Sequence, residues 1–182
     1  MVDKRDQLIK QCAGFLEEIQ GMTAGTEMEQ WLNRKYGPDS TLYNQLAGLI
    51  KTGVEEGWAA DIEIGGAHYR RGRLAEPTAQ TCNFSIAAVY IDSESNPSVA
   101  AGKIFRGDFH EHPHGEVNLV VPLDEGAVLA GPNGWCGAGW TAPAPGSRHY
   151  PEVKGGALIA LFFLPAGSIA YVEPPVQNEV RA

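Results

Sequence analysis

The sequence is poor in cysteine, and its three cysteines, Cys12, Cys82 and Cys136, lie far apart. No CxxC pair occurs, so the chain lacks the pattern of a disulfide framework or of a zinc site built from thiolates. Three separated thiols are typical of a reducing compartment, which favours a cytoplasmic protein. Cys136 lies in a glycine-rich turn, where we expect a small packed residue and not a reactive thiol.

Positive charge is also scarce, because 14 Lys and Arg residues face 22 Asp and Glu residues, for a net charge of -8. Nucleic acids and anionic membranes are bound through clustered Lys and Arg, so neither is expected as a partner. A small anion can still be bound through a few local arginines. No apolar run approaches the roughly 20 residues that span a bilayer. The N-terminal stretch MVDKRDQ lacks the apolar core of a signal peptide.

The first third of the chain predicts helices, within a sequence that is 43% hydrophobic and can therefore form a real core. Apolar residues recur at helical spacing in the first of them: Leu8, Ile9, Cys12, Phe15, Leu16 and Ile19. Thr26 and Glu29 have the spacing of a capping box at the start of a second helix. Asp39 or Ser40 can cap a third, which ends near Gly57.

From Trp58 onward the pattern changes to short apolar runs separated by glycine and proline. The predicted strands are 59–64, 84–91, 102–114, 116–121, 127–130, 137–141, 157–163 and 169–172. Many short strands without intervening helices predict an antiparallel β-sandwich or barrel. We therefore expect a mainly β protein with a helical segment (1–57), a barrel (58–172) and a tail (173–182). The basic run HYRRGR, residues 68–73, predicts a solvated strand end, with contact to an acidic substrate as the alternative.

Three of the five histidines stand on alternate positions of the stretch DFHEHPHGEVN: His110, His112 and His114. On a strand these side chains share one face, about 6–7 Å apart. Two imidazoles at that separation can bind one ion with bonds of about 2.0–2.1 Å. The proline and glycine that follow bend the chain, so that Glu116 can fold back toward the same point. A bound cation, or a substrate anion, accounts for this group of histidines.

A fourth histidine, His149, ends the tight loop GWTAPAPGSRH, just before the predicted strand that starts at Ala157. A histidine at the mouth of a late strand can complete a site that an earlier strand begins. The sequence therefore predicts one site shared between the two histidine segments.

These segments resemble the two metal motifs of the cupin superfamily. His110-x-His112-x-x-x-Glu116 is similar to the first motif, HxHx(3–4)E. The second motif, Gx5PxGxxHxxxN, is matched over residues 139–149, with one residue fewer between its proline and glycine, and with Val153 in place of the asparagine.

The cupin resemblance implies an antiparallel β-barrel of the double-stranded β-helix or jelly-roll type, with an N-terminal helical segment added. It also implies a divalent metal ion held by His110, His112, Glu116 and His149. The ligand set leaves the metal open, since Fe, Mn, Zn, Ni and Co all accept such ligands.

Longer runs resemble the bacterial 4-hydroxylaminobenzoate lyase family of nitroaromatic degradation. They are FRGDFHEHPHGEVNLVVPLDEGA, GAGWTAPAPGSRHYPEV and GGALIALFFLPAG, behind a helical N-terminus. The resemblance implies a carbon–nitrogen lyase that converts 4-hydroxylaminobenzoate, a small aromatic acid, to 3,4-dihydroxybenzoate (protocatechuate) and ammonia. It also implies a homodimer.

For such a substrate, candidate groups stand around the two histidine segments. The candidates for proton transfer are His114, Glu116 and Tyr150. Arg106 and Arg148 could pair with the benzoate carboxylate, and Trp140 and Phe109 could pack against the ring. For the arginines the alternative is a surface ion pair, and for Trp140 it is core packing.

Two other functions remain open at this stage. A site of three histidines and one glutamate also suits a metal-dependent dioxygenase acting on a small aromatic or diketone. The third possibility is a barrel that binds a small molecule without catalysis, although such a protein has no need of this ligand set.

Overall fold

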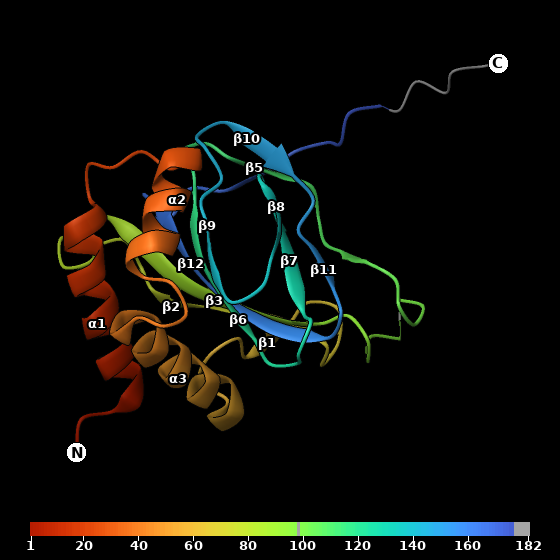
Figure 1. The fold of residues 1–182 in the computed structure, drawn as a ribbon, viewed down its shortest axis with the longest axis horizontal. Coiled ribbons are helices and arrows are strands. Elements are labelled where there is room, and N and C mark those ends of the chain that lie inside the picture. Colours follow the sequence, from red (N-terminus) through yellow and green to blue (C-terminus); the bar gives the residue numbers. More distant parts are fainter. Residues whose placement is uncertain (98, 177–182) are drawn as a thin grey trace.

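The computed structural model describes residues 1–97 and 99–176, and the predicted tail, 173–182, therefore lies partly outside the described residues. Three helices precede the strands in this part of the chain: α1 (Lys4–Ile19), α2 (Thr26–Lys35) and α3 (Thr41–Glu56). The strands are β1 (Ile62–Glu63), β2 (Tyr69–Ala75), β3 (Phe84–Asp92), β4 (Phe105–Arg106), β5 (His110–His112), β6 (Val117–Pro122), β7 (Val128–Gly131), β8 (Gly134–Cys136), β9 (Gly139–Thr141), β10 (Ser147–His149), β11 (Glu152–Lys154), β12 (Ala157–Pro165) and β13 (Ala170–Tyr171). Figure 1 shows the helices on one side of the barrel.

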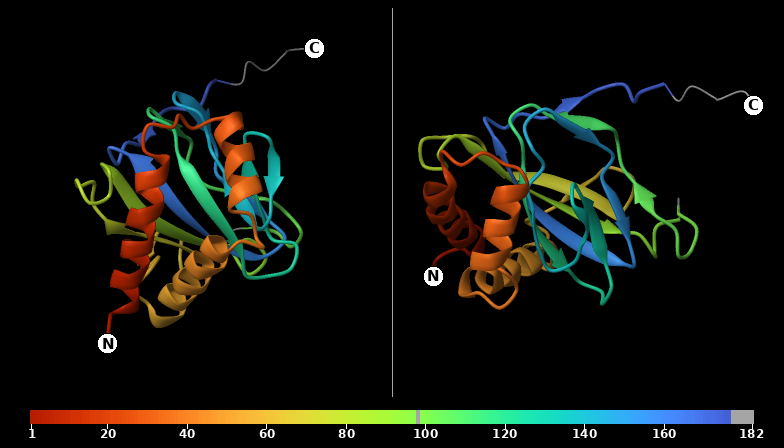
Figure 2. Two further views of the ribbon diagram at one scale, coloured as in Figure 1. Left: turned by 60° about the vertical axis from the view of Figure 1, so that its left-hand side comes forward. Right: turned by 45° about the horizontal axis from the view of Figure 1, so that its top comes forward.

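The strands form a six-stranded sheet, in the order β1-β2-β3-β12-β6-β9, and two smaller sheets. The smaller sheets have the orders β10-β5-β13 and β4-β11-β7-β8. All recorded strand pairs are antiparallel, and the long pairing of β3 with β12 joins segments far apart in the sequence. Figure 2 shows the sheets curving around one interior. The predicted mainly β, cupin-type antiparallel barrel with N-terminal helices is confirmed.

Strand β12 is buried on both faces, which explains why its sequence, ALIALFFLP, is apolar throughout. Ile159, Leu161 and Phe163 belong to the hydrophobic cluster that also contains the buried faces of the three helices. Leu158 and Ala160 point to the opposite face and belong to a second cluster inside the barrel. Because side chains alternate along a strand, one strand contributes to both clusters, and the helices pack directly on the outside of the large sheet.

Local signals place the ends of α3 as the sequence predicts. The Ser40 hydroxyl accepts a hydrogen bond from the Tyr43 backbone N–H at 3.1 Å. Gly57 ends the helix with φ 80°, a left-handed conformation that glycine adopts without steric cost.

The capping box predicted at Thr26 is wrong. Thr26 is the first helical residue, and the N-cap, Gly25, has no side chain to accept a hydrogen bond. The Glu29 carboxylate instead accepts from the Ala142 backbone N–H at 3.0 Å and from Asn133 Nδ2 at 3.1 Å. Glu29 therefore joins α2 to the barrel, and donors from a distant part of the chain outcompete the local motif.

The predicted strands are partly wrong between Trp58 and His114. The strand expected over 59–64 is reduced to Ile62–Glu63, and the one over 102–114 is divided into β4 and β5. Strand β2, which contains most of HYRRGR, was predicted only as a solvated strand end, because its charged residues hide the alternation of a full strand. Its pairing with β3 makes it an inner strand of the large sheet.

Helix α2 covers the edge of the large sheet through Asn33. The Asn33 amide accepts from the Trp140 backbone N–H and donates to the Trp140 carbonyl, both at 2.9 Å. These bonds satisfy backbone groups of β9 that have no further strand to pair with.

Replacing Asn33 with alanine is therefore expected to lower the free energy of unfolding by about 1–2 kcal/mol, because two edge groups lose their partner. Urea unfolding followed by circular dichroism measures this change. Gln30→Ala, an exposed position of the same helix, is the matched control and should change stability by less than about 0.5 kcal/mol. Equal effects of the two substitutions would contradict the role of Asn33.

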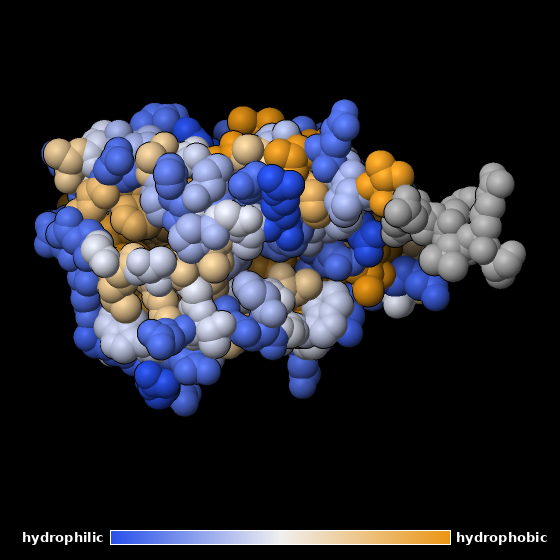
Figure 3. Space-filling view, turned by 90° about the horizontal axis from the view of Figure 1, so that it is seen from above, coloured by the Kyte–Doolittle hydropathy of each residue, from blue (hydrophilic) through white to orange (hydrophobic). Residues whose placement is uncertain are grey.

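The helices, the cysteines and the surface were each compared with what the sequence led us to expect. Within the described ranges, no helix is long and apolar enough to cross a membrane. The three cysteines are free. On the face shown in Figure 3, hydrophilic residues separate small hydrophobic groups.

Candidate metal centre

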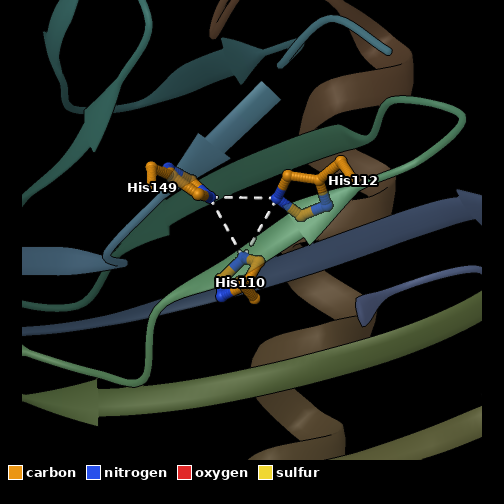
Figure 4. Close-up of side chains that lie close together, drawn as sticks. All are labelled: His110, His112 and His149. Atoms are coloured by element: carbon orange, nitrogen blue, oxygen red, sulfur yellow. Dashed lines mark hydrogen bonds between the residues drawn. The ribbon is translucent and has the colours of Figure 1, made fainter. Parts of the chain in front are cut away.

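Strand register brings three histidines to one point. His110 and His112 lie on the same face of β5, and β10 pairs with β5 so that His149 stands opposite His110. The three Nε2 atoms face one another, as Figure 4 shows. They are separated by 3.0 Å (His110 to His112), 2.9 Å (His112 to His149) and 3.1 Å (His149 to His110).

The surroundings leave the inward-facing nitrogens of His110 and His112 without protons. His110 Nδ1 lies 2.9 Å from the Asp108 carbonyl oxygen, which only accepts, so Nδ1 carries the proton. His112 Nδ1 lies 3.5 Å from Glu116 Oε2, which favours the same tautomer. Burial, together with the neighbouring imidazoles, lowers the pKa of His112 to about 3 and that of His149 to about 4. Burial also lowers the pKa of His110.

These three neutral imidazoles fit a divalent metal ion. Their ligand atoms form a group in which all lie within 4.8 Å of one another. Metal–nitrogen bonds of about 2.0–2.1 Å, set at right angles, place neighbouring donor atoms about 3 Å apart. Lone pairs that meet at such distances repel one another unless a cation lies between them. The donor set, its tautomers and its spacing therefore all suit a metal.

The loop before His149 is one residue shorter than in the second cupin motif, yet it places His149 beside His110 and His112. The Gly146 backbone N–H donates to the His112 carbonyl at 2.8 Å, and the Glu116 N–H donates to the Pro143 carbonyl at 3.0 Å. Gly115 has φ 80°, and a Cβ there would come within 2.8 Å of Ala24 Cβ and 3.0 Å of the Pro143 oxygen. The glycine thus lets the two histidine segments approach each other.

Glu116 lies beside the three histidines but outside their group. Its Oε1 accepts from Asn118 Nδ2 at 2.6 Å, and Asn118 also donates to Thr141 Oγ1 at 3.0 Å. Burial raises the pKa of Glu116 to about 7, and the hydrogen bond from Asn118 acts in the opposite direction. The carboxylate faces His112 Nδ1, the side of the ring away from Nε2.

A pocket opens next to the histidines inside the barrel. His110, His149 and Glu116 line it together with the polar side chains of Asn118 and Thr141. Its walls are mainly apolar: Val89, Ile91, Leu129, Ala160, Phe162 and Ile169. Such a space, with a few convergent polar groups, is typical of a site for a small organic ligand.

Three further residues of this pocket, Tyr69, Arg71 and Tyr171, were not among the predicted site residues. For the run that contains Tyr69 and Arg71, contact with an acidic substrate was only the alternative to a solvated strand end. Tyr69 and Arg71 belong to β2, and the basic run HYRRGR was the sequence signal for them. Tyr171 lies on β13, opposite His110.

The two arginines predicted to bind the substrate lie outside the described pocket lining. Arg106 pairs with Glu152 at 3.1 Å, and Arg148 pairs with Glu111 at 3.2 Å. Both arginine side chains are more than half exposed, at 57% and 58%. In this structure both form surface ion pairs.

The other predicted site residues have different surroundings. Trp140 is fully buried, with its ring centroid 5.0 Å from that of Phe15 in the core beneath the helices. Phe109 packs on Tyr150, with ring centroids 4.8 Å apart, and His114 is exposed. The structure does not bring these residues into the described lining of the pocket.

Comparisons with known proteins identify the family. The profile of the 4-hydroxylaminobenzoate lyase family matches residues 10–171. The chain belongs to this family. It is 61% identical over 170 residues to a 4-hydroxylaminobenzoate lyase from Pseudomonas putida, covering 93% of this chain and 97% of that one. It is 56% identical over 171 residues to a 4-hydroxylaminobenzoate lyase from Nocardioides sp. (strain LMS-CY), covering 93% and 96%.

Among solved structures, crystal structures of DMSP lyases include a chain that matches with a TM-score of 0.42 and 14% identity, covering 94% of this chain and 100% of that one. The family resemblance expected from the sequence is confirmed, and so is the expectation of an enzyme of the lyase class.

Proposed function

We propose that this member of the 4-hydroxylaminobenzoate lyase family converts 4-hydroxylaminobenzoate to 3,4-dihydroxybenzoate and ammonia. The reaction takes up one water molecule. The N–O and C–N bonds break, and the nitrogen leaves as ammonia. Two C–O bonds form, one at the carbon that bore the nitrogen and one at the neighbouring ring carbon, which loses its hydrogen as a proton. The hydroxylamine oxygen and the water molecule together account for these two oxygen atoms. The nitrogen is reduced while the ring is oxidised, so no external oxidant is required.

The observation that supports this proposal most strongly is the group of three neutral imidazoles at the wall of a largely apolar pocket. His110, His112 and His149 would hold a divalent metal ion. When bound, such an ion supplies a Lewis acid that assists departure of the hydroxylamine oxygen.

The remaining residues of the pocket orient the ligands and the substrate. Glu116 accepts a hydrogen bond from Asn118 and faces His112 Nδ1. It thereby favours the tautomer with the proton on Nδ1, which leaves the inward-facing Nε2 free to bind a metal. The apolar walls, such as Leu129 and Phe162, enclose an aromatic ring and exclude water from it. Glu116 was predicted as a metal ligand, and its present contacts support a role behind His112.

An anaerobic assay with 4-hydroxylaminobenzoate tests the proposal. We expect equimolar ammonia and 3,4-dihydroxybenzoate without oxygen, followed by liquid chromatography and an ammonia assay. Product formation that requires oxygen would instead favour the dioxygenase. If the protein binds the substrate and forms no product under either condition, it is a binding barrel.

Metal removal gives a further expected result. Dialysis against a chelator should lower turnover by at least about 100-fold, because the imidazoles alone supply no Lewis acid. Titration with Fe, Mn, Zn, Ni or Co should restore turnover at one ion per chain. Full turnover after verified metal loss would contradict the proposed role of the histidines.

We further propose a cytoplasmic homodimer, as the family resemblance implies. The free thiols of Cys12, Cys82 and Cys136 support a reducing compartment. Sedimentation of the purified protein measures the oligomeric state.

A further inference from the structure

The pocket contains one arginine among its described lining residues, and strand geometry places it there. Tyr69 and Arg71 stand on alternate positions of β2, opposite Ile91 and Val89 of β3. All four side chains line the pocket. Arg70, between them, is directed elsewhere, since its guanidinium carbon lies 4.5 Å from the centre of the Tyr90 ring.

Arg71 has no carboxylate within 4.0 Å among the described residues, unlike the arginines at 73, 106 and 148. It donates a hydrogen bond to the Tyr171 hydroxyl, and its guanidinium carbon lies 5.6 Å from the centre of the Tyr171 ring. Asp108 also lines the pocket, but it is exposed and forms no recorded ion pair with Arg71. A half-buried guanidinium beside apolar walls is thus left with capacity for an anion.

Tyr171 connects this cation to the histidines. It pairs with His110 across β13 and β5, and the two rings are 6.0 Å apart. The same tyrosine therefore contacts Arg71 and the edge of the three-histidine group. A flat molecule in the pocket can meet the guanidinium at one end and the histidines at the other.

We propose that Arg71, positioned by the Tyr171 hydroxyl, binds the carboxylate of the substrate and thereby directs the hydroxylamino end toward His110, His112 and His149. This rests on the proposed function for the identity of the substrate. Arginine suits the task because its fork can donate two parallel hydrogen bonds to a carboxylate. The apolar walls strengthen the attraction by keeping water away from it.

Binding of an unreactive analogue tests the proposal without turnover. Calorimetry compares 4-aminobenzoate with 4-aminobenzamide, which has the same ring and no charge. Arg71→Gln should weaken 4-aminobenzoate binding by about 10- to 100-fold, the range for hydrogen bonds to charged groups. Its binding of 4-aminobenzamide should change by less than about twofold. Arg70→Gln, on the neighbouring position of β2, is the matched control and should bind both compounds as the wild type does.

Two further variants refine the test. Arg71→Lys keeps the positive charge and loses the paired N–H donors of the guanidinium, so we expect an intermediate loss of 4-aminobenzoate affinity. This variant also tests the proposal if Arg71→Gln does not fold. Tyr171→Phe removes the positioning hydroxyl and should raise KM for 4-hydroxylaminobenzoate more than it lowers kcat.

Other results would overturn the inference. Unchanged 4-aminobenzoate affinity in folded Arg71→Gln and Arg71→Lys would do so, as would an equal loss for both compounds. A loss of affinity found only in Arg106→Gln or Arg148→Gln would assign the carboxylate to the residues predicted from the sequence. If the Arg71 effect holds while the wild type forms no product, the carboxylate site stands and the proposed reaction fails.

Discussion

Replacing His112 with alanine is expected to remove the bound metal and to lower kcat/KM by at least about 1000-fold, since a metal Lewis acid contributes several kcal/mol to a transition state. His112 is fully buried, and its Nε2 lies within 3.0 Å of both partner nitrogens. Only the imidazoles of His110 and His149 would remain, and alanine has no nitrogen that could replace the third metal ligand. Metal content by mass spectrometry and turnover under anaerobic conditions measure the two effects.

His68→Ala is the matched control, because His68 lies outside the three-histidine group and the pocket lining. It should retain metal content and turnover. Circular dichroism of His112→Ala separates loss of the ion from loss of the fold. A folded His112→Ala protein with full metal content would contradict the assignment of His112 as a ligand.

Replacing Trp140 with alanine is expected to lower the free energy of unfolding by about 3–5 kcal/mol, the range for removal of a buried large aromatic side chain. The Trp140 ring is fully buried and packs against Phe15, and its indole N–H donates to the Tyr36 carbonyl at 2.7 Å. The alanine would leave a cavity and an unpaired carbonyl between the helices and the barrel. Urea unfolding measures the change.

Two comparisons separate core packing from ring binding at Trp140. Trp135→Ala, at an exposed side chain stacked by Lys154, should change stability by less than about 1 kcal/mol. Trp140→Phe should lose stability while KM of the folded protein stays the same. If Trp140→Phe instead keeps its stability and raises KM, the Trp140 ring contacts the substrate, which is the role first predicted for it from the sequence.

Much of the fold could be predicted because its signals are local. Helical periodicity and the Ser40 cap located α3, and the apolar run at Ala157 located the central strand β12. The HxH spacing needs only one strand to place His110 and His112 together. In each case, the interactions that form the element are between residues close together in the sequence.

The candidate site was less predictable where it depends on partners from elsewhere in the chain. Arg106 and Arg148 stand next to the histidine segments, yet each faces a carboxylate on the adjoining strand. Arg71 is about 40 residues from His110, and only the pairing of β2 with β3 turns it into the pocket. Trp140 contacts helices that precede it by more than 100 residues.

The sequence by itself indicated the class of fold and the histidine motif, because spacing along one chain carries that information, and its resemblance to known lyases indicated the family. Tertiary structure alone decided that the three Nε2 atoms converge, that Glu116 stands behind His112 and that Arg71 lines the pocket. Strand register produced the first result, since a shift of one residue would turn His149 to the opposite face. Register and burial are properties of the packed chain, so residue spacing could suggest these contacts but not select among them.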